Sequence, residues 1–206
     1  MAIQSFFPTL IYYDRLAPQR LHSLNKELVK ECYQVAAEDL EGRRWSDKNY
    51  PGGYTSYGSL AQMHQMSSTF AKLQGWLDKH VAKFAKRLDF DLNEERKLEM
   101  TGCWINIVPK HTYHSLHLHP ISTISGTYYV NTPEDGGDFR IEDPRLSKMM
   151  AQPPRKTRAR SDNQSFVRFK PETGKVILFE SWLRHEVLQN QSDEDRISIS
   201  FNYSWF

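Results

Sequence analysis

The feature that most constrains the fold is a run of short strand-like segments that starts after Leu98 and contains no helical segment. The segments are CWINIV, SGTYYVN, DFRIED, FVRF, KVILFE, HEVLQN and RISISFNYSW. They are rich in β-branched and aromatic residues, and proline, glycine and polar turn formers separate them. Parallel strands need long crossover connections, usually helices, so these strands are expected to pair antiparallel. The pattern predicts a β-sandwich or jelly roll.

The first part of the chain has a different periodicity. Apolar residues recur at spacings of three and four from Pro18 to about Leu40 and again from Phe70 to Leu88, which predicts two helices, the second with Ser67 or Ser68 as N-cap. The segment 42–59 between them is rich in Gly, Tyr and Pro and is expected to be a loop. We predict one α+β, mainly β domain over 1–206. It has a mainly helical part at 1–98 and a jelly-roll core at 99–206 with an insertion at 143–165.

Composition excludes some classes of function. The 27 basic and 25 acidic residues leave a net charge of +2, which gives no strong signal for nucleic acid or for a membrane surface. No apolar stretch approaches the roughly 20 residues that span a bilayer, and the first residues lack a signal-peptide pattern. Cys32 and Cys103 form no CxxC motif and are expected to be reduced thiols in a cytoplasmic protein.

Four of the eight histidines fall within residues 111–119. Residues two apart on a strand face the same way, so His117 and His119 can present two imidazoles to one ion. His111 is expected in the preceding turn, and His114 has the wrong parity to join the pair. With the distant His185, the pair predicts a three-ligand metal site with open positions. An accidental pair on a surface strand and a zinc hydrolase site both remain open at this point.

Arg196 and Ser198 open the last strand-like segment and share its parity. A guanidinium matches a carboxylate in bidentate geometry. If both side chains face the jelly-roll interior, they would bind one end of a dicarboxylate whose other end reaches the metal. The alternative is an ordinary arginine at the rim of a turn.

Several segments together resemble the 2-oxoglutarate- and iron(II)-dependent oxygenase superfamily. They are HxxHxHP at 114–120, SGTYYV at 125–130, EDPR at 142–145, ESWLRHEV at 180–187 and the R-x-S at 196–198. The resemblance implies a double-stranded β-helix, which is a cupin-like jelly roll, with the N-terminal helices packed on one sheet. It implies that His117 and His185 bind iron and that Arg196, with Ser198, binds the far carboxylate of 2-oxoglutarate. An Ile-Asn pair upstream of the first ligand implies that Asn106 also reaches this co-substrate.

One position departs from the superfamily pattern. Most members have a carboxylate two residues after the first histidine, where this chain has His119. We expect His119 to be the third ligand because of its position and strand parity. The nearest alternative carboxylates in sequence are Asp138, Glu142 and Asp143.

The resemblance implies a dioxygenase that uses iron(II), dioxygen and 2-oxoglutarate, forms succinate and hydroxylates a substrate. The substrate, a small molecule or a protein side chain, stays open, as does the oligomeric state, a homodimer included. Basic residues in the insertion fit either a lid or a solvated loop, and Tyr50, Tyr54 and Tyr57 could line the mouth. Two other classes are a cupin-like three-histidine dioxygenase without 2-oxoglutarate and a non-catalytic jelly-roll binding module.

Overall fold

The computed structural model describes residues 2–146 and 149–206, and it contains four α-helices and ten strands within these ranges. The helices are α1 (Pro18–Glu38), α2 (Leu40–Asn49), α3 (Met63–Met66) and α4 (Ser68–Arg87). The strands are β1 (Tyr12–Arg15), β2 (Tyr54–Thr55), β3 (Leu98–Val108), β4 (His114–His117), β5 (Ile124–Asn131), β6 (Phe139–Glu142), β7 (Phe166–Phe169), β8 (Lys175–Glu180), β9 (His185–Val187) and β10 (Arg196–Trp205).

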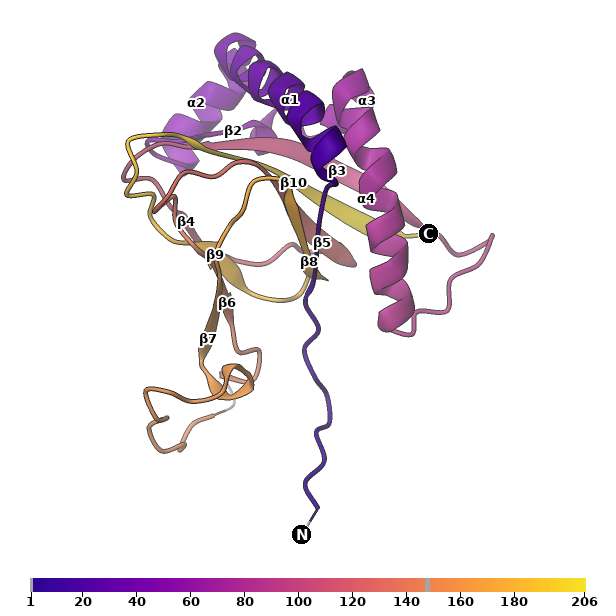
Figure 1. Ribbon diagram of the computed structural model, residues 1–206, viewed down its shortest axis with the longest axis vertical. Coiled ribbons are helices and arrows are strands. Elements are labelled where there is room, and N and C mark those ends of the chain that lie inside the picture. The colour runs from indigo at the N-terminus through magenta and orange to yellow at the C-terminus, as the bar shows by residue number, and fades with distance from the viewer. Residues whose placement is uncertain (1, 147–148) are drawn as a thin grey trace.

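The strands form two antiparallel sheets. The larger has the order β1-β8-β5-β10-β3-β2 and the smaller the order β4-β9-β6-β7. Strand β10 is the last in sequence but lies in the middle of the larger sheet, between β5 and β3 (Figure 1). Most side chains on β10 therefore face one of two interiors.

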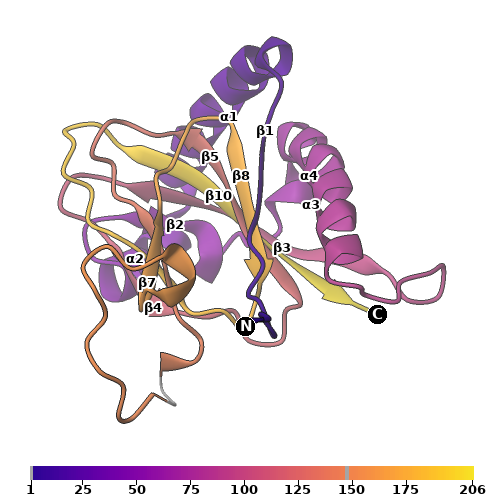
Figure 2. The same cartoon turned by 60° about the horizontal axis from the view of Figure 1, so that its bottom comes forward.

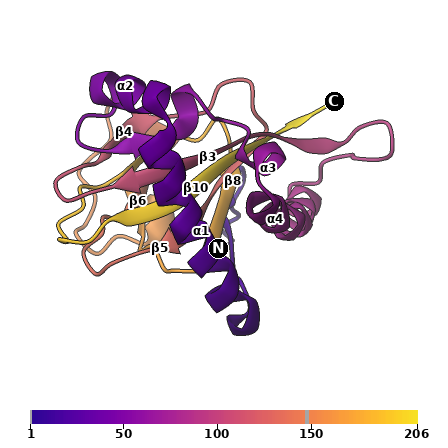
Figure 3. The same cartoon turned by 90° about the horizontal axis from the view of Figure 1, so that it is seen from above.

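The helices cover one face of the larger sheet (Figure 3). Apolar residues of α1 and α4 form one core with the side chains that β3, β5, β8 and β10 direct toward them. Helix α4 begins where predicted, because the Ser67 side chain accepts hydrogen bonds from the backbone N–H groups of Thr69 and Phe70. Its inward stripe is Phe70, Leu73, Leu77, Val81 and Phe84, all buried.

The smaller sheet packs against the opposite face of the larger one (Figure 2). A second core lies between the sheets and contains Tyr129, Ile177 and Phe179 from the larger sheet with Phe139 and Ile141 from the smaller. Two facing antiparallel sheets with helices on the outside are the jelly roll that the sequence predicted, so the expected fold class is confirmed.

The predicted loop at 42–59 is partly wrong, because residues 40–49 form α2. Asp39 ends α1 and also caps α2, since its side chain accepts from the backbone N–H of Gly42. A Cβ at Gly42 would lie 2.0 Å from the Asp39 carboxylate. Glycine at this position therefore makes room for the capping side chain and does not indicate a flexible loop. Strands β1 and β2 also add to the larger sheet from the part expected to be mainly helical.

The predicted insertion separates β6 from β7 and extends away from both sheets (Figure 1). Residues 147 and 148 of it lie outside the described residues, and Ser161–Asn163 form one 3-10 turn. None of the helices in the described ranges combines the length and apolar character needed to cross a membrane.

Candidate metal centre

The predicted histidines come together between the two sheets. One side-chain nitrogen each of His117, His119 and His185 lies within 4.8 Å of the others, and no other group of three or more such ligands occurs in the described ranges. Strand pairing explains part of this, because His117 is the register partner of His185 across β4 and β9. His119 follows the end of β4, where its backbone N–H donates to the Ser181 carbonyl oxygen at 3.0 Å.

Hydrogen bonds fix which nitrogen of each ring carries the proton. The Nδ1 of His117 lies 2.7 Å from the Ser115 carbonyl oxygen, and that of His185 lies 2.9 Å from the Leu183 carbonyl oxygen. A carbonyl can only accept, so both Nδ1 atoms donate and both Nε2 atoms present lone pairs. The Nδ1 of His119 lies 2.7 Å from Asn202 Oδ1, which gives the same tautomer. Bonds of this kind orient the histidine ligands of metal sites.

The two Nε2 atoms of His117 and His119 are 3.3 Å apart. With both protons on Nδ1, two lone pairs face each other with no proton between them, an arrangement that a cation would stabilise. Two nitrogens that bind one ion at about 2.1 Å are roughly 3.0–3.4 Å apart for octahedral to tetrahedral angles. The residues present therefore fit a bound metal ion.

Electrostatics favour the neutral rings that metals require. Burial lowers the pKa of all three histidines. The pKa of His119 falls to about 4, because burial and the neighbouring His117 outweigh the opposite effect of the bond to Asn202. The pKa of His185 lies well below its ordinary value, first through burial and then through the neighbouring rings.

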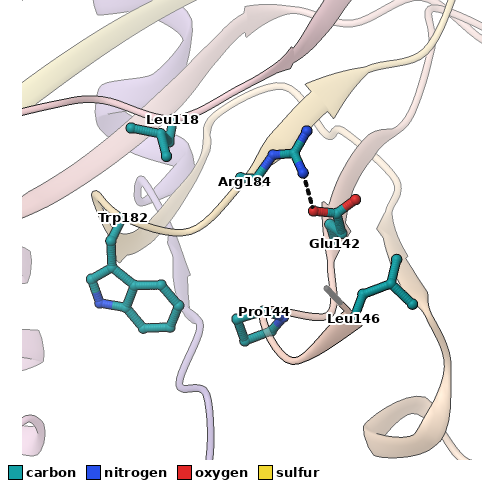
Figure 4. Close-up of a pocket in the computed structure, with 6 residues that line it drawn as sticks. All are labelled: Leu118, Glu142, Pro144, Leu146, Trp182 and Arg184. Carbon is teal, nitrogen blue, oxygen red and sulfur yellow. Dashed lines mark hydrogen bonds and ion pairs between the residues drawn. The ribbon is translucent and has the colours of Figure 1, made fainter. Parts of the chain in front are cut away.

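The alternative carboxylates lie elsewhere. Glu142 is on the outer face of the smaller sheet, where it accepts a hydrogen bond from Arg184 at 2.8 Å in a groove of about 360 Å³ (Figure 4). Leu118, which separates the two histidines in sequence, lines this groove and so faces away from the rings. Asp143 is bound by Arg145, and neither it nor Asp138 belongs to the ligand group.

A fourth histidine also joins the cluster, and here the predicted parity was wrong. His114 pairs with Val187, and His117 pairs with His185, so three residue steps along β4 correspond to two along β9. This β-bulge restores the parity and turns His114 to the interior face. Its ring centroid lies 4.3 Å from that of His117 and 5.1 Å from that of Tyr50.

Arg196 is buried in the same interior, with 1% of its surface exposed. Its Nε and Nη2 have no hydrogen-bond partner among the described residues, and neither has the hydroxyl of Tyr129. The guanidinium carbon lies 5.3 Å from the Tyr129 ring centroid. Burial raises the pKa of Tyr129, while the nearby Arg196 acts in the opposite direction. A buried cation with free donors costs several kcal/mol unless an anion pairs with it, so this arrangement fits a carboxylate ligand.

Tyr129 was missed by sequence reasoning. Strand alternation puts one of Tyr128 and Tyr129 on each face of β5, but the sequence does not say which. The structure places Tyr128 in the core under the helices, where its hydroxyl donates to Asn25 Oδ1, and it places Tyr129 beside Arg196.

The remaining predicted residues divide into two groups. Ser198 is buried on the same face of β10 as Arg196, as its parity predicted. Asn106 is the register partner of Ser198, but its side-chain amide donates to Ser200 Oγ at 3.0 Å. Of the three tyrosines, Tyr50 reaches His114, whereas Tyr54 donates to Asp39 and Tyr57 packs on Trp104.

Together the fold and the site define the class: a jelly roll that gathers imidazoles and a free guanidinium in one interior has the architecture of a non-haem metal oxygenase. Residues 102–202, just under half of the chain, match the sequence model of a family described as "Putative 2OG-Fe(II) oxygenase". A comparison with curated proteins finds no match. Over these residues the chain is similar to the 2-oxoglutarate- and iron(II)-dependent oxygenases, enzymes whose cofactor is iron(II) and whose co-substrates are 2-oxoglutarate and dioxygen.

Solved structures share the fold at low sequence identity. A prolyl-4-hydroxylase from Pseudomonas putida is 16% identical, with a TM-score of 0.61 over 93% of this chain and 91% of that one. The 2-oxoglutarate-dependent epimerase SnoN from nogalamycin biosynthesis is 14% identical, with a TM-score of 0.65 over 95% and 76%. HygX from Streptomyces hygroscopicus, solved with nickel, 2-oxoglutarate and hygromycin B, is 16% identical, with a TM-score of 0.60 over 95% and 83%.

Proposed function

We propose that this protein is an oxygenase that hydroxylates an organic substrate, with iron(II) bound by His117, His119 and His185 and 2-oxoglutarate bound between the metal and Arg196. Ser198 and Tyr129 complete the carboxylate site beside Arg196. The observation that carries the proposal is the buried guanidinium, two of whose nitrogens lack partners among the described residues, in the same interior as the three lone-pair nitrogens. A dicarboxylate that reaches both would neutralise the arginine and supply oxygen ligands to the metal.

The reaction is balanced by its two co-substrates. The substrate R–H, dioxygen and 2-oxoglutarate give R–OH, succinate and carbon dioxide, so one oxygen atom enters the substrate and the other enters succinate. Bound iron(II) supplies the activation of dioxygen. The chain itself holds the ligand rings in the Nδ1-protonated tautomer, positions the keto acid through Arg196, and buries His185, Arg196 and Ser198 in this interior.

Three neutral ligands change the charge of the site. Iron(II), doubly charged 2-oxoglutarate and the Arg196 cation sum to one positive charge, whereas two histidines and one carboxylate would sum to zero. Part of that charge is offset by the carbonyl and amide oxygens that accept from the three Nδ1 atoms, since they raise the basicity of the rings. We expect the excess charge to favour binding of anionic co-substrate.

The first alternative, a three-histidine dioxygenase without 2-oxoglutarate, leaves Arg196 without a role. It would have to keep a buried cation with two free donors in its working state, which costs several kcal/mol. The second alternative, a non-catalytic binding module, gives no reason for three imidazoles to share one tautomer and converge.

An anaerobic titration tests the proposal. Adding 2-oxoglutarate to the protein with iron(II) should produce a visible metal-to-ligand charge-transfer band, and Arg196→Met should weaken the apparent affinity about 10- to 100-fold. Arg168→Met removes an exposed arginine from the outer face of the smaller sheet and is the matched control. In air, the loaded protein should release succinate. Iron binding without any response to 2-oxoglutarate would favour the first alternative.

The ligand set has its own experiment. His119→Ala should reduce iron occupancy, as should His117→Ala and His185→Ala, while Asp138→Ala and Glu142→Ala should retain it. Circular dichroism checks that each variant is folded. Full occupancy in His119→Ala together with loss in either acidic variant would transfer the third position to a carboxylate.

A further inference from the structure

The interior contains one polar ring for which the proposed iron and carboxylate sites give no role, that of His114. It is not a fourth member of the ligand group, although its ring centroid is only 4.3 Å from that of His117. Neither of its nitrogens has a hydrogen-bond partner in the part of the chain that the structure describes. The ring is only partly buried, and its nitrogens are not among the fully enclosed polar atoms that lack partners, so its one donor and one acceptor are accessible to a ligand.

The position of this ring is set by the backbone and by Tyr50. The β-bulge between His114 and His117 turns the side chain inward, where its neighbours on β9 are Val187 and His185. Tyr50 meets the ring edge-on at 87° from the end of α2. An exposed loop histidine would have neither a bulge nor a buried aromatic partner to fix its direction.

The ring also lies within the electrostatic reach of Arg196. The pKa values of both His114 and Tyr50 respond to the arginine charge, which lowers each of them, although burial is the larger influence on both. His114 thus contacts the iron ligand His117 and faces the same interior in which Arg196 is buried. The proposed function places 2-oxoglutarate in the space between these two.

We infer that His114 donates a hydrogen bond to the bound 2-oxoglutarate and that Tyr50 is a positioning residue that holds the ring in the donating orientation. The inference rests on the proposed function. It gives the free nitrogen a partner and adds a neutral donor to a co-substrate site in which Arg196 supplies the charge. A hydrogen bond to a charged acceptor is among the stronger ones, because the charge is only partly shielded in this interior.

The test compares three variants by the 2-oxoglutarate dissociation constant of the anaerobic iron(II) protein. His114→Phe keeps the ring contact with Tyr50 but removes the donor, and we expect it to weaken binding about 10-fold or more. His114→Gln keeps an amide donor at similar reach and should recover most of the affinity. His111→Asn is the matched control, because this histidine is exposed in the preceding turn at φ +65°, which asparagine tolerates.

Iron affinity, measured in the absence of 2-oxoglutarate, separates the roles. It should stay within about two-fold of wild type in His114→Phe, whereas a loss as large as that of His117→Ala would make His114 a metal ligand and overturn the inference. Equal 2-oxoglutarate affinities in wild type, His114→Phe and His114→Gln would also overturn it. If the wild-type protein binds iron but not 2-oxoglutarate, the proposed function itself fails.

Tyr50→Phe and Tyr50→Ala test the positioning role. Tyr50→Phe keeps the edge-on ring and should leave the 2-oxoglutarate affinity close to wild type. Tyr50→Ala frees the imidazole and should weaken 2-oxoglutarate binding in the wild-type background but add little to His114→Phe. Independent, additive losses in the double variant would contradict an action of Tyr50 through His114.

Discussion

The two faces of strand β10 carry opposite chemistry. Toward the helices it directs Ile197, Ile199, Phe201 and Tyr203, each at most 1% exposed. Toward the smaller sheet it directs Arg196, Ser198, Ser200 and Asn202, and the last of these contacts His119. Because the strand is central, both of its faces are interior. Burying polar side chains costs free energy unless they have hydrogen-bond or ion-pair partners, so the polar face needs such partners. One face stabilises the fold, and the other, at a cost in stability, forms the site.

A substitution on the apolar face should have the largest effect on the free energy of unfolding. Phe201 is fully buried and lies so close to Gly126 that a Cβ there would come within 2.6 Å of its ring. Phe201→Ala leaves a cavity in this core, and we expect it to lower the free energy of unfolding by about 3–5 kcal/mol. Urea denaturation followed by circular dichroism measures the change. The 2-oxoglutarate affinity of the folded protein should stay close to wild type, and a loss of less than about 1 kcal/mol would contradict the assigned role.

A substitution on the polar face should change the free energy of unfolding in the opposite direction. Arg196→Met replaces a buried guanidinium, of which two nitrogens lack partners, by an apolar side chain of similar length. We expect the free energy of unfolding of the ligand-free protein to rise by about 1–4 kcal/mol, although 2-oxoglutarate binding becomes weaker. The same denaturation experiment without ligand measures it. A clear destabilisation would mean that Arg196 has a structural partner, and would weaken the case for a ligand.

Much of this contrast could be predicted from the sequence, because alternation needs only local information. The alternating pattern of RISISFNYSW is enough to place Arg196 and Ser198 on one face. His185 is far from His117 in sequence, but this did not prevent the prediction that they come together, since antiparallel pairing of short strands brings distant segments into register. The helices of the first part followed from periodicity in the same way.

The features that could not be predicted depend on β-bulges, which interrupt the alternation of side chains along a strand, and on a helix cap. The bulge that turns His114 inward adds one residue to β4 and leaves no mark in the sequence. The face of Tyr129 depends on the register of β5 against β10, which shifts between Ile197 and Ser198. Helix α2 begins at a cap that depends on the contact between Asp39 and Gly42, in a stretch whose composition indicates a loop.

Asn202 connects the polar face to the metal centre. Its Oδ1 lies 2.7 Å from His119 Nδ1, so Asn202→Ala removes the acceptor that fixes this ring. We expect iron affinity to fall about 10-fold, at the low end of such effects, because Ser125 Oγ lies 2.8 Å from the same nitrogen and can replace part of the bond. Competition with a metallochromic chelator measures the affinity. Ser200→Ala, two residues away on the same face, is the control and should leave it unchanged.

The smallest expected effect distinguishes Ser198 on β10 from its register partner Asn106 on β3. Ser198→Ala removes a hydroxyl beside Arg196 and should raise the 2-oxoglutarate dissociation constant by about five-fold, as the loss of one hydrogen bond of about 1 kcal/mol predicts. Its register partner Asn106 already donates its amide to Ser200, so Asn106→Ala should have a smaller effect on the same constant. Isothermal titration under anaerobic conditions resolves the two. The reverse order would transfer the assisting role from Ser198 to Asn106 and extend the carboxylate site from β10 onto β3.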